Sequence, residues 1–143
     1  MRVMVLVKAN KDSEAGKLPS EQGLTNMMKF NEELVKAGVM LAGEGLHPSS
    51  TAKRVRFNGK ERVVVDGPFA ETTQLVAGFW LWQVRSMDEA VEWLKRMPCD
   101  DGEGPSEVEI RRVFEAEDFG ANLTPEIRAK ESELRGLVST QRS

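Results

Sequence analysis

The sequence predicts a single α+β domain in which two amphipathic helices cover one face of an antiparallel β-sheet. Three observations favour this class. Short β-branched runs alternate with two helical segments, an Asn-Gly dipeptide separates two strand-like runs, and a length of 143 residues suits one hydrophobic core. The expected order is strand, helix, strand, hairpin, strand, helix, strand. This order is that of a ferredoxin-like βαββαβ sandwich with an inserted β-hairpin.

The first half of the chain predicts a strand, a helix and a second strand. Residues 2–8 form a β-branched run typical of a strand. Ser20 is a preferred helix N-cap, and Gly38 is expected to end the helix because glycine favours the C-terminal cap. A strand over 39–42 follows. The helix's apolar residues at helical spacing, expected to be buried, are Leu24, Met27, Met28, Leu34 and Val35.

The clearest local signal is Asn58-Gly59 between the strand-like runs 52–57 and 60–65. Both residues tolerate positive φ, which predicts a two-residue hairpin turn. In that register Arg56 lies opposite Glu61. A strand over 75–84, a helix that begins at Ser86 and a strand over 107–114 complete the body. We expect residues 1–118 to form the domain and 119–143 a helical tail, whose helix begins at Thr124-Pro125.

Two strands are apolar on both faces, which is unusual for a sheet with one face in water. In the run 76–84, Trp80 and Trp82 lie on one side and Phe79 and Leu81 on the other. Two helices can cover only one face, so the second face needs another cover. We expect a homodimer through the face that bears Trp80 and Trp82. The alternative is that the hairpin and the C-terminal tail fold over that face.

Composition excludes several classes of function. The net charge of −3 provides no basic field for nucleic acid. One cysteine, Cys99, and one histidine, His47, are too few for a disulfide or a structural zinc site. The apolar run 3–7 is too short for a signal segment or a membrane span. We therefore expect a cytoplasmic protein with no membrane contact, no metal and no cofactor.

The segment Val64-Val-Asp-Gly-Pro-Phe-Ala-Glu71, with Ala77-Gly-Phe-Trp80 and Asp88-Glu-Ala-Val-Glu-Trp93 after it, resembles the DGPF branch of the YCII-related family. The segments 43–48 and 107–111 are similar to a turn and to the closing strand of these proteins. The resemblance covers residues 1–118. It implies a dimeric α/β barrel, in which two ferredoxin-like sheets pack face to face, and a small cleft beside the DGPF turn.

The resemblance also implies a His–Asp pair, of which this sequence holds only one half. YCII relatives typically carry a histidine early in the first helix, where this chain has Gln22-Gly-Leu-Thr25. Only the aspartate carries over, as Asp66. His47 could replace the missing histidine from a different element.

Asp66 and His47 are the candidate catalytic residues. Asp66 could act as a general base in an apolar cleft, where burial raises a carboxyl pKa, or its carboxylate could cap the amide of Phe69 or Ala70 in an Asx turn. His47 could shuttle a proton near neutral pH, or it could be an exposed loop residue. A hairpin brings its entry and exit together, so we expect Asp66 and His47 to line one cleft.

The candidate binding residues surround the same turns. Glu44 and Glu71 could pair with Arg54 or Arg56, and Phe69 could stack on an aromatic ligand. The alternatives are surface ion pairs, worth under about 1 kcal/mol, and core packing.

The resemblance implies no settled reaction. The first function class is a cofactor-independent enzyme with lyase-like or proton-transfer chemistry on a small organic acid or phenol. The second is a non-catalytic small-molecule-binding or regulatory module, and the third is a protein whose function is its assembly. Whether the chain is an enzyme stays open at this point.

Overall fold

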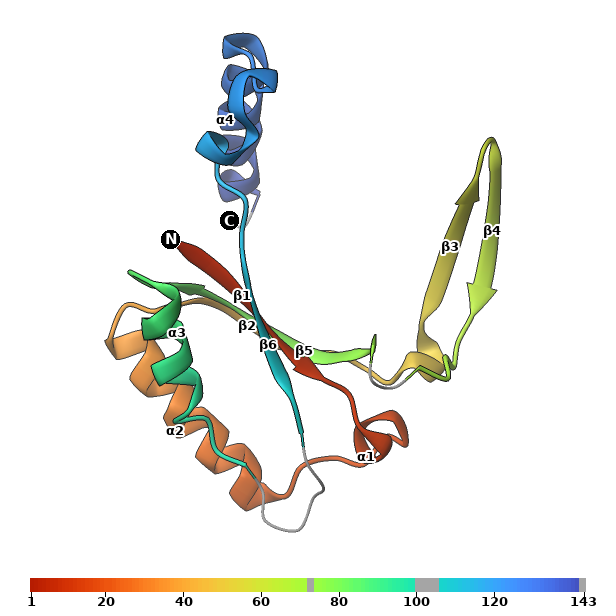
Figure 1. Ribbon diagram of the computed structural model, residues 1–143. Helices are drawn as coiled ribbons and strands as arrows, with labels where there is room; N and C mark the ends of the chain where they lie inside the picture. The colour runs from red at the N-terminus through yellow and green to blue at the C-terminus, as the bar shows by residue number, and fades with distance from the viewer. Residues whose placement is uncertain (72–73, 100–105, 142–143) are drawn as a thin grey trace. The chain divides into compact units, whose positions relative to one another are not determined.

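The structure is a computed structural model that describes residues 1–71, 74–99 and 106–141. The chain divides into two compact units, Met1–Arg112 and Val113–Ser143. The elements of the first unit are β1 (Arg2–Lys8), α1 (Lys11–Glu14), α2 (Glu21–Lys36), β2 (Met40–Gly45), the 3-10 turn η1 (Ser49–Thr51), β3 (Lys53–Asn58), β4 (Glu61–Asp66), β5 (Val76–Gln83), α3 (Met87–Leu94) and β6 (Val108–Arg112) (Figure 1).

Strands β1, β2, β5 and β6 form one antiparallel sheet in the order β2-β5-β1-β6. This is the ferredoxin-like arrangement, with the first and third strands of the βαββαβ pattern paired in the middle. Helices α2 and α3 lie on one side of the sheet (Figure 1). The α+β class predicted from the sequence is confirmed. Between β2 and β5 in the chain, β3 and β4 pair with each other as a separate two-stranded antiparallel sheet.

The helix ends follow the predicted capping residues. The Ser20 hydroxyl accepts a hydrogen bond from the Gly23 amide at 3.0 Å, and the Ser86 hydroxyl accepts one from the Glu89 amide at 3.1 Å. Gly38 follows the end of α2 with φ of 72°, a left-handed conformation that favours glycine.

The core lies between α2 and the side of the sheet that carries Trp80 and Trp82. These two side chains are 6% and 0% exposed, and both meet Phe30 of α2 edge to face, with ring centroids 5.8 and 6.4 Å apart. The Trp80 indole N–H donates to the Asn31 side-chain oxygen at 3.0 Å. The expectation that this face forms a dimer interface is therefore wrong, because the chain's own helix covers it.

Helix α2 buries a narrower stripe than its sequence predicts. Phe30 and Leu34 are buried, whereas Leu24, Met28 and Val35 are at least half exposed. Phe30 and Leu34 lie four residues apart, so they share one face of the helix, and the exposed positions lie beside that face. The helix has apolar residues on two adjacent faces, and packing against the sheet buries only one of them.

The opposite side of the sheet carries the apolar residues that alternate with the core. We call this surface the open sheet face and define it by the side chains of Met4, Leu6, Phe79 and Leu81. Leu81 pairs with Met4, and Phe79 pairs with Leu6, so the four side chains are adjacent. Each is partly buried, whereas Val3 and Val5 on the helix side are 0% exposed.

The second unit contains η3 (Ala116–Asn122) and α4 (Pro125–Thr140). The predicted start of α4 is confirmed, since the Thr124 hydroxyl accepts a hydrogen bond from the Ile127 amide at 3.3 Å and Pro125 is the first helical residue. Phe114 and Phe119 stack with ring centroids 5.1 Å apart, and both side chains are more than half exposed.

Candidate functional site

The DGPF segment begins where the hairpin returns to the body. The Gly67 amide donates to the Ala52 carbonyl at 2.9 Å, and a Cβ placed on Gly67 would lie 1.7 Å from the Ser49 carbonyl oxygen. That gap admits no side chain, so glycine is required at this position because of a close backbone approach. The contact joins the chain before the hairpin to the chain after it.

Ser49 is the centre of a polar network that sequence reasoning missed. It is 6% exposed, and its hydroxyl accepts the Phe69 amide hydrogen at 3.0 Å while donating to the Glu14 carboxylate. The Ser49 amide donates to the other Glu14 oxygen at 3.0 Å. The expected Asx turn is therefore wrong for the Phe69 amide, because a serine hydroxyl from another segment already occupies it.

Arg54 joins two of the predicted binding residues. Its guanidinium lies 3.8 Å from the centroid of the Phe69 ring and 3.5 Å from a carboxylate oxygen of Glu71. The structure thus brings Phe69 and Glu71 together through a cation from β3. Both residues follow the hairpin, and the pairing of Glu71 with Arg54 is one of those that the sequence suggested.

The surroundings of Asp66 differ from the expected apolar cleft. Its side chain is 72% exposed, and its carboxylate lies 2.5 Å from the Lys53 ammonium across the hairpin pair. His47, just after β2, is also exposed. The backbone segments that hold these residues meet at the Ser49–Gly67 contact. Their joint role in one cleft remains a prediction.

The two remaining candidates lie on different sheets. Glu44 is on β2, paired with Phe79. Arg56 lies opposite Val63, so the predicted Arg56–Glu61 pair is wrong. The turn is Gly59-Lys60 rather than Asn58-Gly59, with only Gly59 at positive φ (58°), and Asn58 pairs with Glu61.

A separate cavity of about 270 Å³ lies between the start of α2, the end of β1 and the chain after α3. Its wall is mostly apolar, with Lys8, Asn10 and Ser106 as polar residues. The Lys8 side chain is 18% exposed and lies 3.5 Å from Glu109. The lining residues are Val7, Lys8, Asn10, Pro19, Gly23, Leu24, Met27, Met97, Pro98, Cys99 and Ser106.

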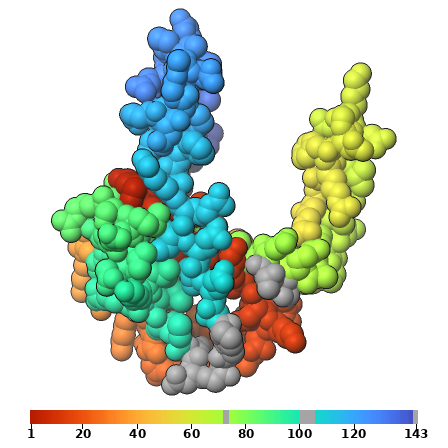
Figure 2. All heavy atoms as spheres, in the orientation of Figure 1, coloured from red at the N-terminus to blue at the C-terminus, as the bar shows by residue number. Residues whose placement is uncertain are grey.

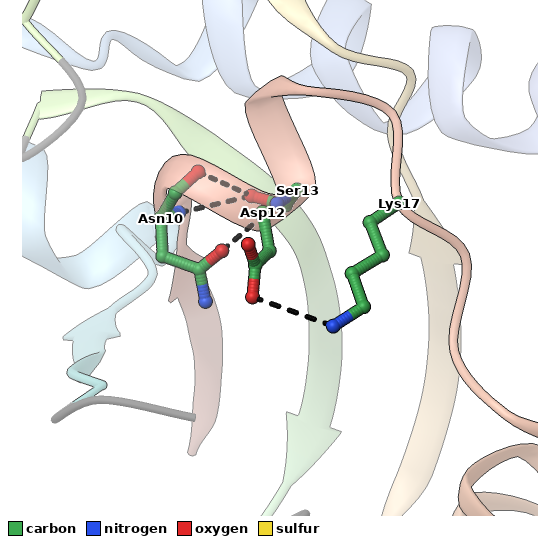
Figure 3. Close-up of polar contacts among 4 residues, drawn as sticks. All are labelled: Asn10, Asp12, Ser13 and Lys17. Atoms are coloured by element: carbon green, nitrogen blue, oxygen red, sulfur yellow. Dashed lines mark hydrogen bonds and ion pairs between the residues drawn. The ribbon is translucent and has the colours of Figure 1, made fainter. Parts of the chain in front are cut away.

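Helix α1 connects the cavity to the DGPF segment. At its start, the Asn10 side chain and the Ser13 hydroxyl accept hydrogen bonds from each other's amides, and Asp12 pairs with Lys17 at 3.8 Å (Figure 3). At its end, Glu14 holds Ser49. Helix α1 therefore begins beside Asn10 in the cavity wall and ends at Glu14. Glu14 holds Ser49, and the Ser49 hydroxyl accepts the hydrogen bond from the Phe69 amide.

Within the described residues, no group of three or more His, Cys, Asp or Glu side chains is arranged to hold a metal ion. In that part of the chain, no helix combines the length and apolar character needed to cross a membrane. The expectation of a site without metal or cofactor stays a prediction.

Comparison with known proteins identifies the family. The model of the YCII-related domain matches residues 1–117. This chain belongs to the YCII-related domain family. An uncharacterized protein of Rhizobium meliloti (strain 1021) is 32% identical over 75 residues, which cover 52% of this chain and 60% of that relative.

Among solved structures, the chain is similar to 5-chloro-2-hydroxyhydroquinone dehydrochlorinase from Burkholderia phenoliruptrix AC1100, in complex with 2,5-dihydroxybenzoquinone. The TM-score is 0.42 at 13% sequence identity, over 82% of this chain and 98% of that one.

Proposed function

We propose that this YCII-related protein binds a small organic acid or phenol in the cavity at the start of α2. The observation that carries the proposal is the composition of the wall, which combines mostly apolar residues with one lysine, one asparagine and one serine. Small-molecule sites combine an apolar lining with a few polar groups that orient the ligand. A volume of about 270 Å³ suits a ligand of one ring.

Lys8 is the group that selects an anion in this proposal. Its side chain is 18% exposed and its ammonium lies 3.5 Å from a carboxylate oxygen of Glu109, so a ligand carboxylate or phenolate would compete with Glu109 for this cation. The cavity also includes Gly23, in the segment where YCII relatives carry their histidine. Ligand binding here therefore needs no imidazole.

Thermal-shift screening against small organic acids and phenols tests the proposal, because a ligand of the folded state raises the melting temperature. For the best compound, Lys8→Met should weaken binding about 10- to 100-fold, the value of one charge-assisted hydrogen bond. Lys11→Met is the matched control, since Lys11 is exposed and does not line the cavity. Equal affinity in both variants would contradict the proposal.

A second candidate function is cofactor-independent proton transfer or lyase-like chemistry on the same class of compound. The observation that favours it is the backbone contact between Ser49 and Gly67, which joins the segments of His47 and Asp66. If these two residues move the proton, Asp66→Asn and His47→Asn should each lower the rate about 10²- to 10⁴-fold. Glu61→Gln, on the same hairpin, should leave the rate unchanged. Turnover that survives both site variants would exclude this role.

The functional unit in this proposal is a homodimer through the open sheet face. Phe79, Leu81, Met4 and Leu6 present an apolar surface that the helices of the first unit do not cover. Contiguous apolar patches of this kind are typical of interfaces between copies of a chain.

A further inference from the structure

We infer that the β3–β4 hairpin is an arm that packs against the body of a second copy of the chain. One face of the hairpin carries Val55, Phe57 and Val64, which are 48%, 72% and 60% exposed. We call these three side chains the arm face. Figure 2 shows the hairpin, in yellow, projecting from the body. At its base Gly67 lies against the backbone of Ser49 in η1.

A two-stranded sheet with an apolar face needs a surface to pack on. Isolated hairpins are marginal in water, because a pair of strands buries too little apolar area. The charged residues on the same face are already engaged, since Lys53 pairs with Asp66 at 2.5 Å and the Arg62 guanidinium lies 4.7 Å from the Phe57 ring centroid. The part of the face between these paired groups, at Val55 and Val64, is apolar and exposed.

The base of the arm is held rigidly enough to present that face. The Gly67 amide bonds to Ala52, the Phe69 amide bonds to buried Ser49, and Arg54 bridges Phe69 and Glu71. A surface fixed before association loses little conformational freedom when it docks.

Charge indicates which surface of a second copy receives the arm. Residues 53–66 hold five basic and two acidic side chains, a net charge of +3, whereas residues 1–52 and 67–112, the body of the first unit, hold 11 basic and 15 acidic side chains, a net charge of −4. Two hairpins repel each other, whereas a basic hairpin is attracted to an acidic body. The arm face therefore docks on the body of the second copy and not on its hairpin.

The area of the open sheet face also favours a second copy of the chain as the partner. Four strands spaced about 4.8 Å apart and about 20 Å long give a footprint of roughly 400 Å². A stable interface buries about 800 Å² on each partner. One face of a hairpin with two six-residue strands has an area of roughly 200 Å². In a twofold dimer each copy buries this area twice, once on its own hairpin and once on the surface that receives the hairpin of the second copy. Sheet and arms together reach the area that a stable dimer needs.

The inference rests on the proposed homodimer, and matched variants separate the two. Val64→Thr and Phe57→Ser change the arm face, whereas Val63→Thr changes the adjacent residue on the opposite face of the same strand. Analytical ultracentrifugation across a concentration series should show dimer dissociation constants at least tenfold higher for the arm-face variants and unchanged for Val63→Thr. Hydrogen exchange should show β3 and β4 amides less protected at dissociating concentrations.

Each outcome decides something different. A wild-type dimer that both arm-face variants leave intact would overturn the arm and leave the sheet interface standing. A monomeric wild type would overturn both. A stability loss in Val64→Thr that does not depend on concentration would mean that the hairpin packs on its own chain, and would overturn the inference too.

Discussion

Gly67 is the residue at which the fold is least tolerant of a side chain. Gly67→Ala would force the Cβ to within 1.7 Å of the Ser49 carbonyl unless the backbone moves. We expect a loss of roughly 1–3 kcal/mol or more in the free energy of unfolding, the cost of overpacking against a fixed neighbour. Chemical denaturation measures it. Gly45→Ala is the control, because a Cβ there meets nothing within 4 Å; equal stability of the two variants would contradict the account.

Most contacts of individual residues around the DGPF segment were not predictable from the sequence. The DGPF tetrapeptide was visible in the sequence, but its partner Ser49 was not, because a serine in a polar loop gives no sign of burial. Glu14 was not among the candidate residues, and its carboxylate accepts hydrogen bonds from the amide and the hydroxyl of Ser49. Asp66 was expected in an apolar cleft and is 72% exposed. Contacts between segments far apart in sequence leave no periodic signal.

Among the helices and strands, α2 packs on the sheet through only one of its two apolar faces. Phe30→Ala should lower the free energy of unfolding by about 3–5 kcal/mol, because the ring is buried against both core tryptophans. Met28→Ala, two residues away and 57% exposed, should cost under about 1 kcal/mol. Urea titration of both variants checks the assignment. Comparable losses would mean that the helix buries a different face.

Helices and strands were largely predictable, since caps and periodicity are local. Ser20, Ser86 and Thr124 begin helices as their positions predict. The hairpin turn moved by one residue, to Gly59-Lys60, because a single glycine at positive φ suffices for the turn that forms. The face of β5 that meets the helices was not predictable, because both faces are apolar.

In the molecule as a whole, adjacent residues of β5 face the core on one side and the proposed dimer interface on the other. Leu81→Glu should give a folded monomer, because it places a charge on the open sheet face. Trp80→Glu should unfold the chain, because Trp80 is 6% exposed beneath α2. Light scattering and circular dichroism distinguish these results. A folded monomer from Trp80→Glu would restore the interface expected from the sequence.

NMR of methyl-labelled methionine can show whether a ligand binds in the cavity at the start of α2. Met27 and Met97 line the cavity, Met4 lies on the open sheet face, and Met28 is exposed on α2 outside the cavity. Titration with the compound that gives the largest thermal shift should move the methyl signals of Met27 and Met97 in a saturable way and leave Met28 unchanged. Saturable shifts confined to Met4, with Met27 and Met97 unmoved, would contradict the claim and place the ligand on the sheet instead.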